Sequence, residues 1–103
     1  MGDRGIIMAA WLMTDDNRDF TQFMRWFLGL YDIALISFTS CAKTIAWIDD
    51  AEQGKLEGEL PEAAILNYAL IYETGDEIAE RLRSSPLFAR LPIIMMSGYD
   101  VEA

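Results

Sequence analysis

The sequence predicts one α/β domain over residues 1–103, built on a parallel β-sheet that helices cover on both faces. The length suffices for one small domain. Short apolar runs alternate with segments of helical periodicity, and those segments are long enough to cross over a sheet. The apolar runs show no regular alternation with polar residues, which is typical of strands buried on both faces.

Strands are predicted at residues 6–14, 33–38, 63–68 and 93–97. Gly5 and the acidic pair Asp15 and Asp16 bound the first of these runs. A polar, glutamate-rich loop over residues 53–61 precedes the third, and residues 69–75 form a turn after it. The fourth run follows Pro92 directly.

The first helix is predicted from residue 18 to about residue 30, with Asp16 or Asn17 as its cap. Its apolar residues at helical spacing define a stripe that should face the sheet: Phe20, Phe23, Met24, Phe27 and Leu30. Trp26 and Leu28 fall outside this stripe. They are either exposed to solvent or in contact with something outside the domain.

A second helix is predicted over about residues 41–51, with Thr39 or Ser40 as its cap, and a third over residues 76–84. The inward residues of the second are expected to be Cys41, Ala42, Ile45 and Ile48. Those of the third are expected to be Ile78, Ala79 and Leu82.

Charge and composition exclude several classes of function. The net charge of −9 argues against direct binding to nucleic acid or to an anionic membrane, because both require basic surface. Cys41 is the only cysteine, so no internal disulfide can form, and we expect a cytoplasmic protein. The absence of histidine removes the commonest general base and metal ligand. The apolar segment 5–13 is too short to span a bilayer.

Polar residues follow the predicted strands where each one ends: Asp15 and Asp16 after the first, Asn67 in the third and Ser97 in the fourth. Carboxyl ends of parallel strands meet at one edge of a sheet, where ligands bind. Two carboxylates beside a third oxygen donor suit a hard cation such as Mg²⁺. The alternative is that the acidic pair only caps a helix and that Ser97 only ends a strand.

The order and spacing of several segments resemble the receiver domain of two-component response regulators along nearly the whole chain. Residues 13–20 resemble the acidic-pair segment, and Pro61 and Glu62 resemble the lead into the third strand. Gly75 and the helix through Arg83 resemble the segment after the phosphorylation loop. Residues 91–99 are very similar to the fourth strand and its Ser/Thr signature. The resemblance implies a three-layer, flavodoxin-like sheet with the strand order 2-1-3-4.

The resemblance also implies roles for single residues. Asp15 and Asp16 match the acidic pair that binds magnesium, and Ala69 matches the residue whose backbone carbonyl is a further ligand. Ser97 matches the hydroxyl that follows the phosphoryl group. Asn67 stands at the phosphoacceptor position, and an amide cannot form the acyl phosphate. We therefore expect no catalytic residue and no required cofactor, with at most weak Mg²⁺ binding.

Other departures from the family lie in the turn and after the fourth strand. Ile71 replaces a proline, no lysine follows Lys55, and nothing in the sequence matches the fifth strand and helix. The chain is thus expected to be a degenerate, truncated receiver or a fragment of a longer one. Its apolar fourth strand would be exposed, so we expect an interface with a signalling protein or a second copy. The predicted interface residues are Trp26, Leu28, Ile93, Ile94, Met95 and Met96.

Three functions follow from these observations. The first is a non-enzymatic pseudo-receiver that acts in two-component or phosphorelay signalling by phosphorylation-independent protein binding. The second is a phosphoacceptor receiver that a histidine kinase phosphorylates, with Glu73 or Asp76 as substitute acceptors. The third is a small flavodoxin-like cofactor binder, although the sequence has no glycine-rich phosphate loop.

Overall fold

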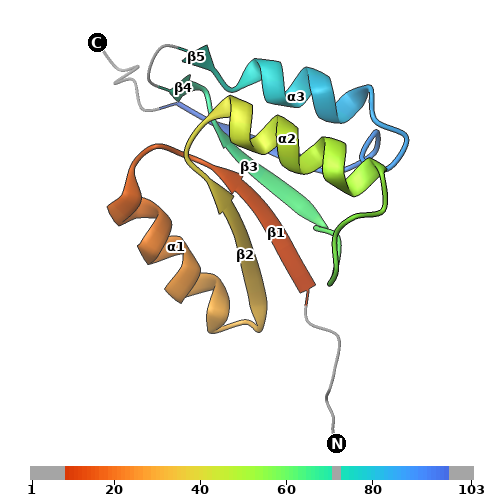
Figure 1. Ribbon diagram of the computed structural model, residues 1–103. Coiled ribbons are helices and arrows are strands. Elements are labelled where there is room, and N and C mark those ends of the chain that lie inside the picture. Colours follow the sequence, from red (N-terminus) through yellow and green to blue (C-terminus); the bar gives the residue numbers. More distant parts are fainter. Residues whose placement is uncertain (1–8, 71–72, 98–103) are drawn as a thin grey trace, which may run out of the picture.

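A parallel sheet of four strands in the order β2-β1-β3-β6 forms the middle layer of the computed structural model, which describes residues 9–70 and 73–97 (Figure 1). Helix α1 covers one face, and α2 and α3 lie side by side over the other (Figure 1). The elements follow one another as β1 (Ala9–Thr14), α1 (Arg18–Gly29), β2 (Ile33–Phe38), α2 (Cys41–Glu52), β3 (Ala63–Asn67), β4 (Ala69–Leu70), β5 (Glu73–Thr74), α3 (Asp76–Arg83) and β6 (Ile93–Met96).

The predicted fold class and strand order are confirmed, with β6 as the fourth strand of the sheet. Residues 6–8, which the prediction included in the first strand, lie outside the described residues. The prediction of a plain turn after the third strand was wrong, because β4 and β5 pair there as a short antiparallel hairpin. Polar side chains cap the first two helices: Asn17 accepts a hydrogen bond from the Phe20 amide, and Ser40 accepts one from the Lys43 amide.

The sheet divides the core in two. Leu12, Ile48, Leu66, Ile78, Leu82 and Phe88 are among the buried side chains between the sheet and helices α2 and α3. On the other face, Met13, Leu28, Leu35 and Ile65 form a smaller buried cluster beneath α1. Strand β3 contributes to both clusters, as expected for a central strand in a sheet covered on both sides.

The predicted buried stripe of α1 was wrong in part. Leu28 is only 4% exposed and anchors the helix on the sheet, so it cannot belong to the surface interface proposed for it. Phe23, Phe27 and Leu30, which were expected to face inward, are exposed, as is Trp26. The six apolar residues of this helix occupy an arc of about 200° at 100° per residue, and the sheet covers only one flank of that arc.

Helix α2 also differs from its predicted pattern. Thr44 and Ala51 are buried beside Cys41 and Ile48, whereas Ala42 is exposed. Thr44 lies opposite Thr14 of β1, and their hydroxyl oxygens are 2.8 Å apart with both residues 0% exposed. Because the Thr44 hydroxyl donates to the Ser40 carbonyl at 2.9 Å, Thr14 must be the donor in the pair. This bond joins α2 to the strand end that precedes Asp15.

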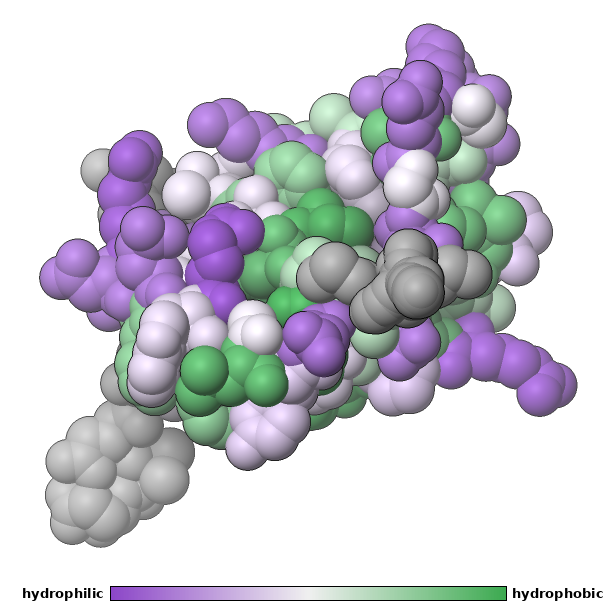
Figure 2. All heavy atoms as spheres, turned by 90° about the horizontal axis from the view of Figure 1, so that it is seen from below, coloured by the Kyte–Doolittle hydropathy of each residue, from purple (hydrophilic) through white to green (hydrophobic). Residues whose placement is uncertain are grey.

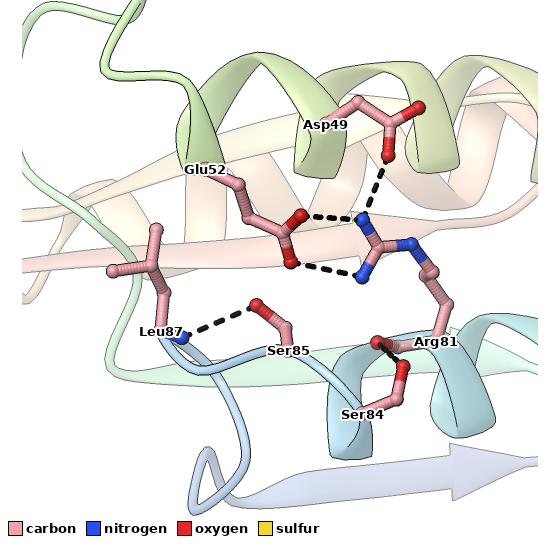
Figure 3. A network of polar contacts seen from close by, with 6 residues as sticks. All are labelled: Asp49, Glu52, Arg81, Ser84, Ser85 and Leu87. Atoms are coloured by element: carbon pink, nitrogen blue, oxygen red, sulfur yellow. Dashed lines mark hydrogen bonds and ion pairs between the residues drawn. The ribbon is translucent and has the colours of Figure 1, made fainter.

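An ion pair network ties α2 to α3 at the surface (Figure 3). The Arg81 guanidinium donates to both carboxylate oxygens of Glu52, at 2.9 and 2.7 Å, and to Asp49 at 2.7 Å. The hydrogen bond from Arg81, followed by one from Ser85, lowers the pKa of Glu52 from 4.5 to about 2. Both carboxylates raise the pKa of Arg81, with Glu52 the larger cause.

No helix in the described part of the chain is long and apolar enough to cross a membrane.

The surface is not uniformly polar. Figure 2, which views the molecule from below, shows apolar areas between charged side chains. Exposed large apolar residues include Trp26, Leu30 and Tyr31 at the end of α1 and Ile94 and Met95 on β6. Such groupings are informative about function when they are contiguous, since scattered apolar residues are normal on protein surfaces.

Thr44→Val should lower the free energy of unfolding by about 1–3 kcal/mol, because it leaves the buried Thr14 hydroxyl without an acceptor. Urea denaturation of the single and double variants measures this. The double variant Thr14→Val with Thr44→Val should be closer to the wild type than Thr44→Val alone, since both partners are then apolar. Strictly additive losses would contradict the assigned hydrogen bond.

Candidate functional site

The pairing of β1 with β3 brings two of the predicted site residues together. Thr14 is aligned with Leu66, so Asp15 and Asn67 follow at adjacent strand ends on the carboxyl edge of the sheet. On the other side of β3, Asn67 is aligned with Met96, which precedes Ser97. Ser97 therefore lies at the same edge as the other two residues.

Asp15 and Asn67 are held by complementary hydrogen bonds. The Asn67 amide nitrogen donates to Asp15 Oδ1 at 3.2 Å, and the Asn17 backbone amide donates to the same oxygen at 2.8 Å. The Asn67 side-chain oxygen accepts from the Ala69 backbone amide at 3.2 Å. Asp15 is only 4% exposed, so these donors compensate a carboxylate that has largely left water.

An open hollow of about 260 Å³ lies at this edge, lined by Asp15, Asn17, Phe20, Asn67, Met96 and Ser97. The structure thus brings together Asp15, Asn67 and Ser97. Asp16 and Ala69, the other predicted magnesium ligands, are not among its lining residues. Asp16 is partly buried, and Ala69 begins strand β4 opposite Thr74.

Hydrogen bonds engage one of the predicted ligand atoms at this edge. Asp15 Oδ1 already accepts two hydrogen bonds, and the group beside it is the amide nitrogen of Asn67, which cannot ligate a metal. Within residues 9–70 and 73–97, no three His, Cys, Asp or Glu side chains gather where they could hold a metal ion. Weak Mg²⁺ binding at Asp15 and Asp16 stays a prediction.

The substitute acceptors considered from sequence, Glu73 and Asp76, are not among the residues that line this hollow. Glu73 accepts a hydrogen bond from the Cys41 backbone amide at 2.6 Å and so caps the start of α2. Asp76 accepts a hydrogen bond from the Thr74 hydroxyl. Burial, followed by the charge of Glu73, raises the pKa of the Cys41 thiol to about 12, so this thiol is protonated and unreactive at neutral pH.

Gly75 supports the site, and the sequence did not show why a glycine is required at this position. Its backbone amide donates to the Tyr68 carbonyl at 2.9 Å. A Cβ at this position would meet the Asn67 backbone carbonyl at a separation that real side chains do not adopt. Close approach of two backbones therefore requires glycine here. The sequence offered only the presence of a glycine in the turn.

Comparison with known proteins adds evidence on the fold. No protein-family model matches this sequence, and no curated protein matches it. A crystal structure of a sensor protein from Polaromonas sp. JS666 is similar, with a TM-score of 0.72 and 16% identity over 91% of this chain and 69% of that chain. The bacteriophytochrome response regulator RtBRR is similar with a TM-score of 0.71 and 18% identity, over 93% of this chain and 60% of that one.

This chain has a receiver-like fold. At these identities the similarity concerns the fold, and the chain spans less than two thirds of the response regulator's length. In the receiver-like frame, the position that the resemblance assigns to the phosphoacceptor is Asn67 at the end of β3. Its side chain points toward Asp15 and bonds to it.

Asn67→Asp should destabilise the protein by about 1–2 kcal/mol at neutral pH without a divalent cation, because two carboxylates would then face each other in place of a donor and an acceptor. Excess MgCl₂ should restore much of this loss, since a cation can lie between carboxylates. Urea denaturation with EDTA or MgCl₂ measures both effects.

Asn67→Ala is the matched control, because it removes the same hydrogen bond without adding a charge. It should also lose stability, but MgCl₂ should not restore it. An Asn67→Asp variant as stable as the wild type in EDTA would contradict the role given to the hydrogen bond between Asn67 and Asp15.

Proposed function

We propose that this receiver-like domain is a non-enzymatic signalling module that binds another protein and does not accept a phosphoryl group. The observation that carries this proposal is the hydrogen bonding of the Asn67 side chain. Its amide donates to Asp15 and accepts from Ala69, so both polar ends of the side chain are engaged. An amide is in any case too poor a nucleophile for an acyl phosphate to form.

A contiguous apolar surface on α1 supports binding as the activity. We call the exposed residues Phe23, Trp26, Phe27, Leu30 and Tyr31 the aromatic patch. The aromatic rings of the patch contact one another: the Phe27 ring centroid lies 5.9 Å from that of Phe23 and 5.5 Å from that of Tyr31. Trp26 is 60% exposed, and its ring lies 5.9 Å from Phe23. Exposed clusters of this kind usually mark an interface, and aromatic residues dominate binding energy there.

The patch follows from the width of the apolar arc on α1. The sheet buries the flank that carries Leu28 and partly buries Phe20 and Met24. The remaining flank is apolar and unpartnered within the described part of the chain. A helix that needs only to cover a sheet requires a narrower stripe, so the second flank is better explained by a second contact.

Strand β6 offers another apolar surface, at the opposite end of the strand order from β2. Ile94 and Met95 are 48% and 40% exposed, whereas Ile93 and Met96 are partly buried. Helix α1 packs chiefly against β2, which lies at the other edge of the sheet from β6. We therefore assign the partner to the aromatic patch and treat β6 as a separate edge.

A second copy of the chain is the first partner to test. The overall charge of −9 opposes association of two copies. Helix α1 carries Arg18 and Arg25 against Asp19 alone, so it is the least acidic of the three helices. Two such helices could pair across a two-fold axis, which gives each copy the same apolar contact.

The wild-type protein should therefore dimerise at micromolar concentration, and Phe23→Ser with Trp26→Ser should be monomeric by light scattering. Both residues are exposed, so the variant should keep its thermal midpoint. Leu87→Ser is the matched control, because Leu87 is equally apolar and 46% exposed after α3. A monomeric wild type would remove self-association and leave a different protein as the partner.

Phosphoacceptor activity is tested with acetyl phosphate and with beryllofluoride in excess MgCl₂. We expect no phosphorylated species by mass spectrometry and no stoichiometric beryllofluoride complex for the wild type, because the attacking carboxylate is absent. Asn67→Asp should gain at least partial binding. A phosphorylated wild-type chain would overturn the proposal, and mapping the site would test Glu73 and Asp76 directly.

A further inference from the structure

A larger hollow lies beside the receiver-like edge, where α1 begins, β2 ends and α2 begins. It has a volume of about 500 Å³ and is lined by Arg18, Thr21, Gln22, Ser37, Phe38, Thr39 and Lys43. None of these residues lines the hollow at Asp15 and Asn67. Its volume lies within the range of about 300–1,000 Å³ typical of small-molecule sites.

The charge of this hollow is opposite to that of the chain. The sequence contains 17 acidic residues and 8 basic ones, yet two basic side chains and no acidic residue of the described part line the hollow. Within residues 9–70 and 73–97, neither Arg18 nor Lys43 makes an ion pair, whereas Arg81 is fully engaged by Asp49 and Glu52. Two basic side chains thus line one hollow of an acidic protein.

Hydroxyl groups in the lining add donors for an anion. Helices α1 and α2 both begin at this edge (Figure 1), with Asn17 as the cap of α1 and with Ser40 and Glu73 as caps of α2. Arg25 donates to the Ser37 oxygen at 2.7 Å and to the Leu35 carbonyl at 2.8 Å. Because Ser37 accepts that bond, its own hydrogen remains to be donated to a ligand.

We propose that this hollow binds a small organic phosphate, a phosphomonoester with a body about the size of a nucleoside. Arg18 and Lys43 hold the dianionic phosphate, and the hydroxyls of Ser37 and Thr39 donate to it. A bare anion would fill only a small part of the volume, so an organic body occupies the rest. That body lies against Phe38, and the Gln22 amide can bond to its polar atoms. This proposal does not depend on the protein-binding function.

Titration with adenosine 5′-monophosphate, adenosine and inorganic phosphate, followed by amide NMR at low salt, tests the site. The monophosphate should shift the amides of Arg18, Thr39 and Lys43 saturably. Adenosine and inorganic phosphate should each bind about tenfold more weakly or worse, because each lacks one half of the recognised ligand. Equal binding of adenosine and its monophosphate would overturn the proposal, as would the absence of saturable shifts at these amides.

Arg18→Gln and Lys43→Gln should each weaken monophosphate binding by about tenfold or more, as expected for loss of a charged hydrogen-bond donor. Lys55→Gln is the matched control, since Lys55 is an exposed lysine that does not line the hollow. It should leave the affinity unchanged. An equal loss in Lys43→Gln and Lys55→Gln would show a general charge effect and overturn the site. Thermal melting confirms that the exposed substitutions preserve the fold.

Discussion

The register between β1 and β3 is the constraint on which the rest of this structure depends. The pairing of Thr14 with Leu66 makes the two strands end together. The residues that follow, Asp15 and Asn67, therefore lie side by side at one edge of the sheet. The same pairing leaves β3 central and buried on both faces, and it gives the two cores their separate sides. A slip of one residue would reverse every side chain of β3 and destroy both cores.

Hydrogen bonds hold Asp15 and Asn67 together at that edge. In a receiver-like edge, facing carboxylates repel one another unless a cation lies between them. Here Asn67 supplies a donor to the buried Asp15, and the capping turn at Asn17 supplies another. The Asn67 amide both donates to Asp15 and accepts from the Ala69 backbone amide.

Sequence periodicity predicted the elements of the fold well, but it could not decide how each helix is oriented. The apolar residues of α1 span so wide an arc that several faces could have been buried, and only contact with the sheet selected Leu28. Thr44 was missed because a buried hydroxyl looks polar in a sequence until its partner Thr14 is opposite it. The β4–β5 hairpin was missed because two-residue strands carry no periodic signal.

The sequence by itself determined the alternation of strands and helices, the parallel sheet and the presence of an amide at position 67, because these depend on local composition and order. The tertiary structure decided which side chains meet: Asn67 with Asp15, Arg18 with Lys43 around one hollow, and the aromatic patch with solvent. These pairings depend on strand register and on the rotation of each helix about its axis. Contacts between residues far apart in the sequence fix both, so no single segment encodes them.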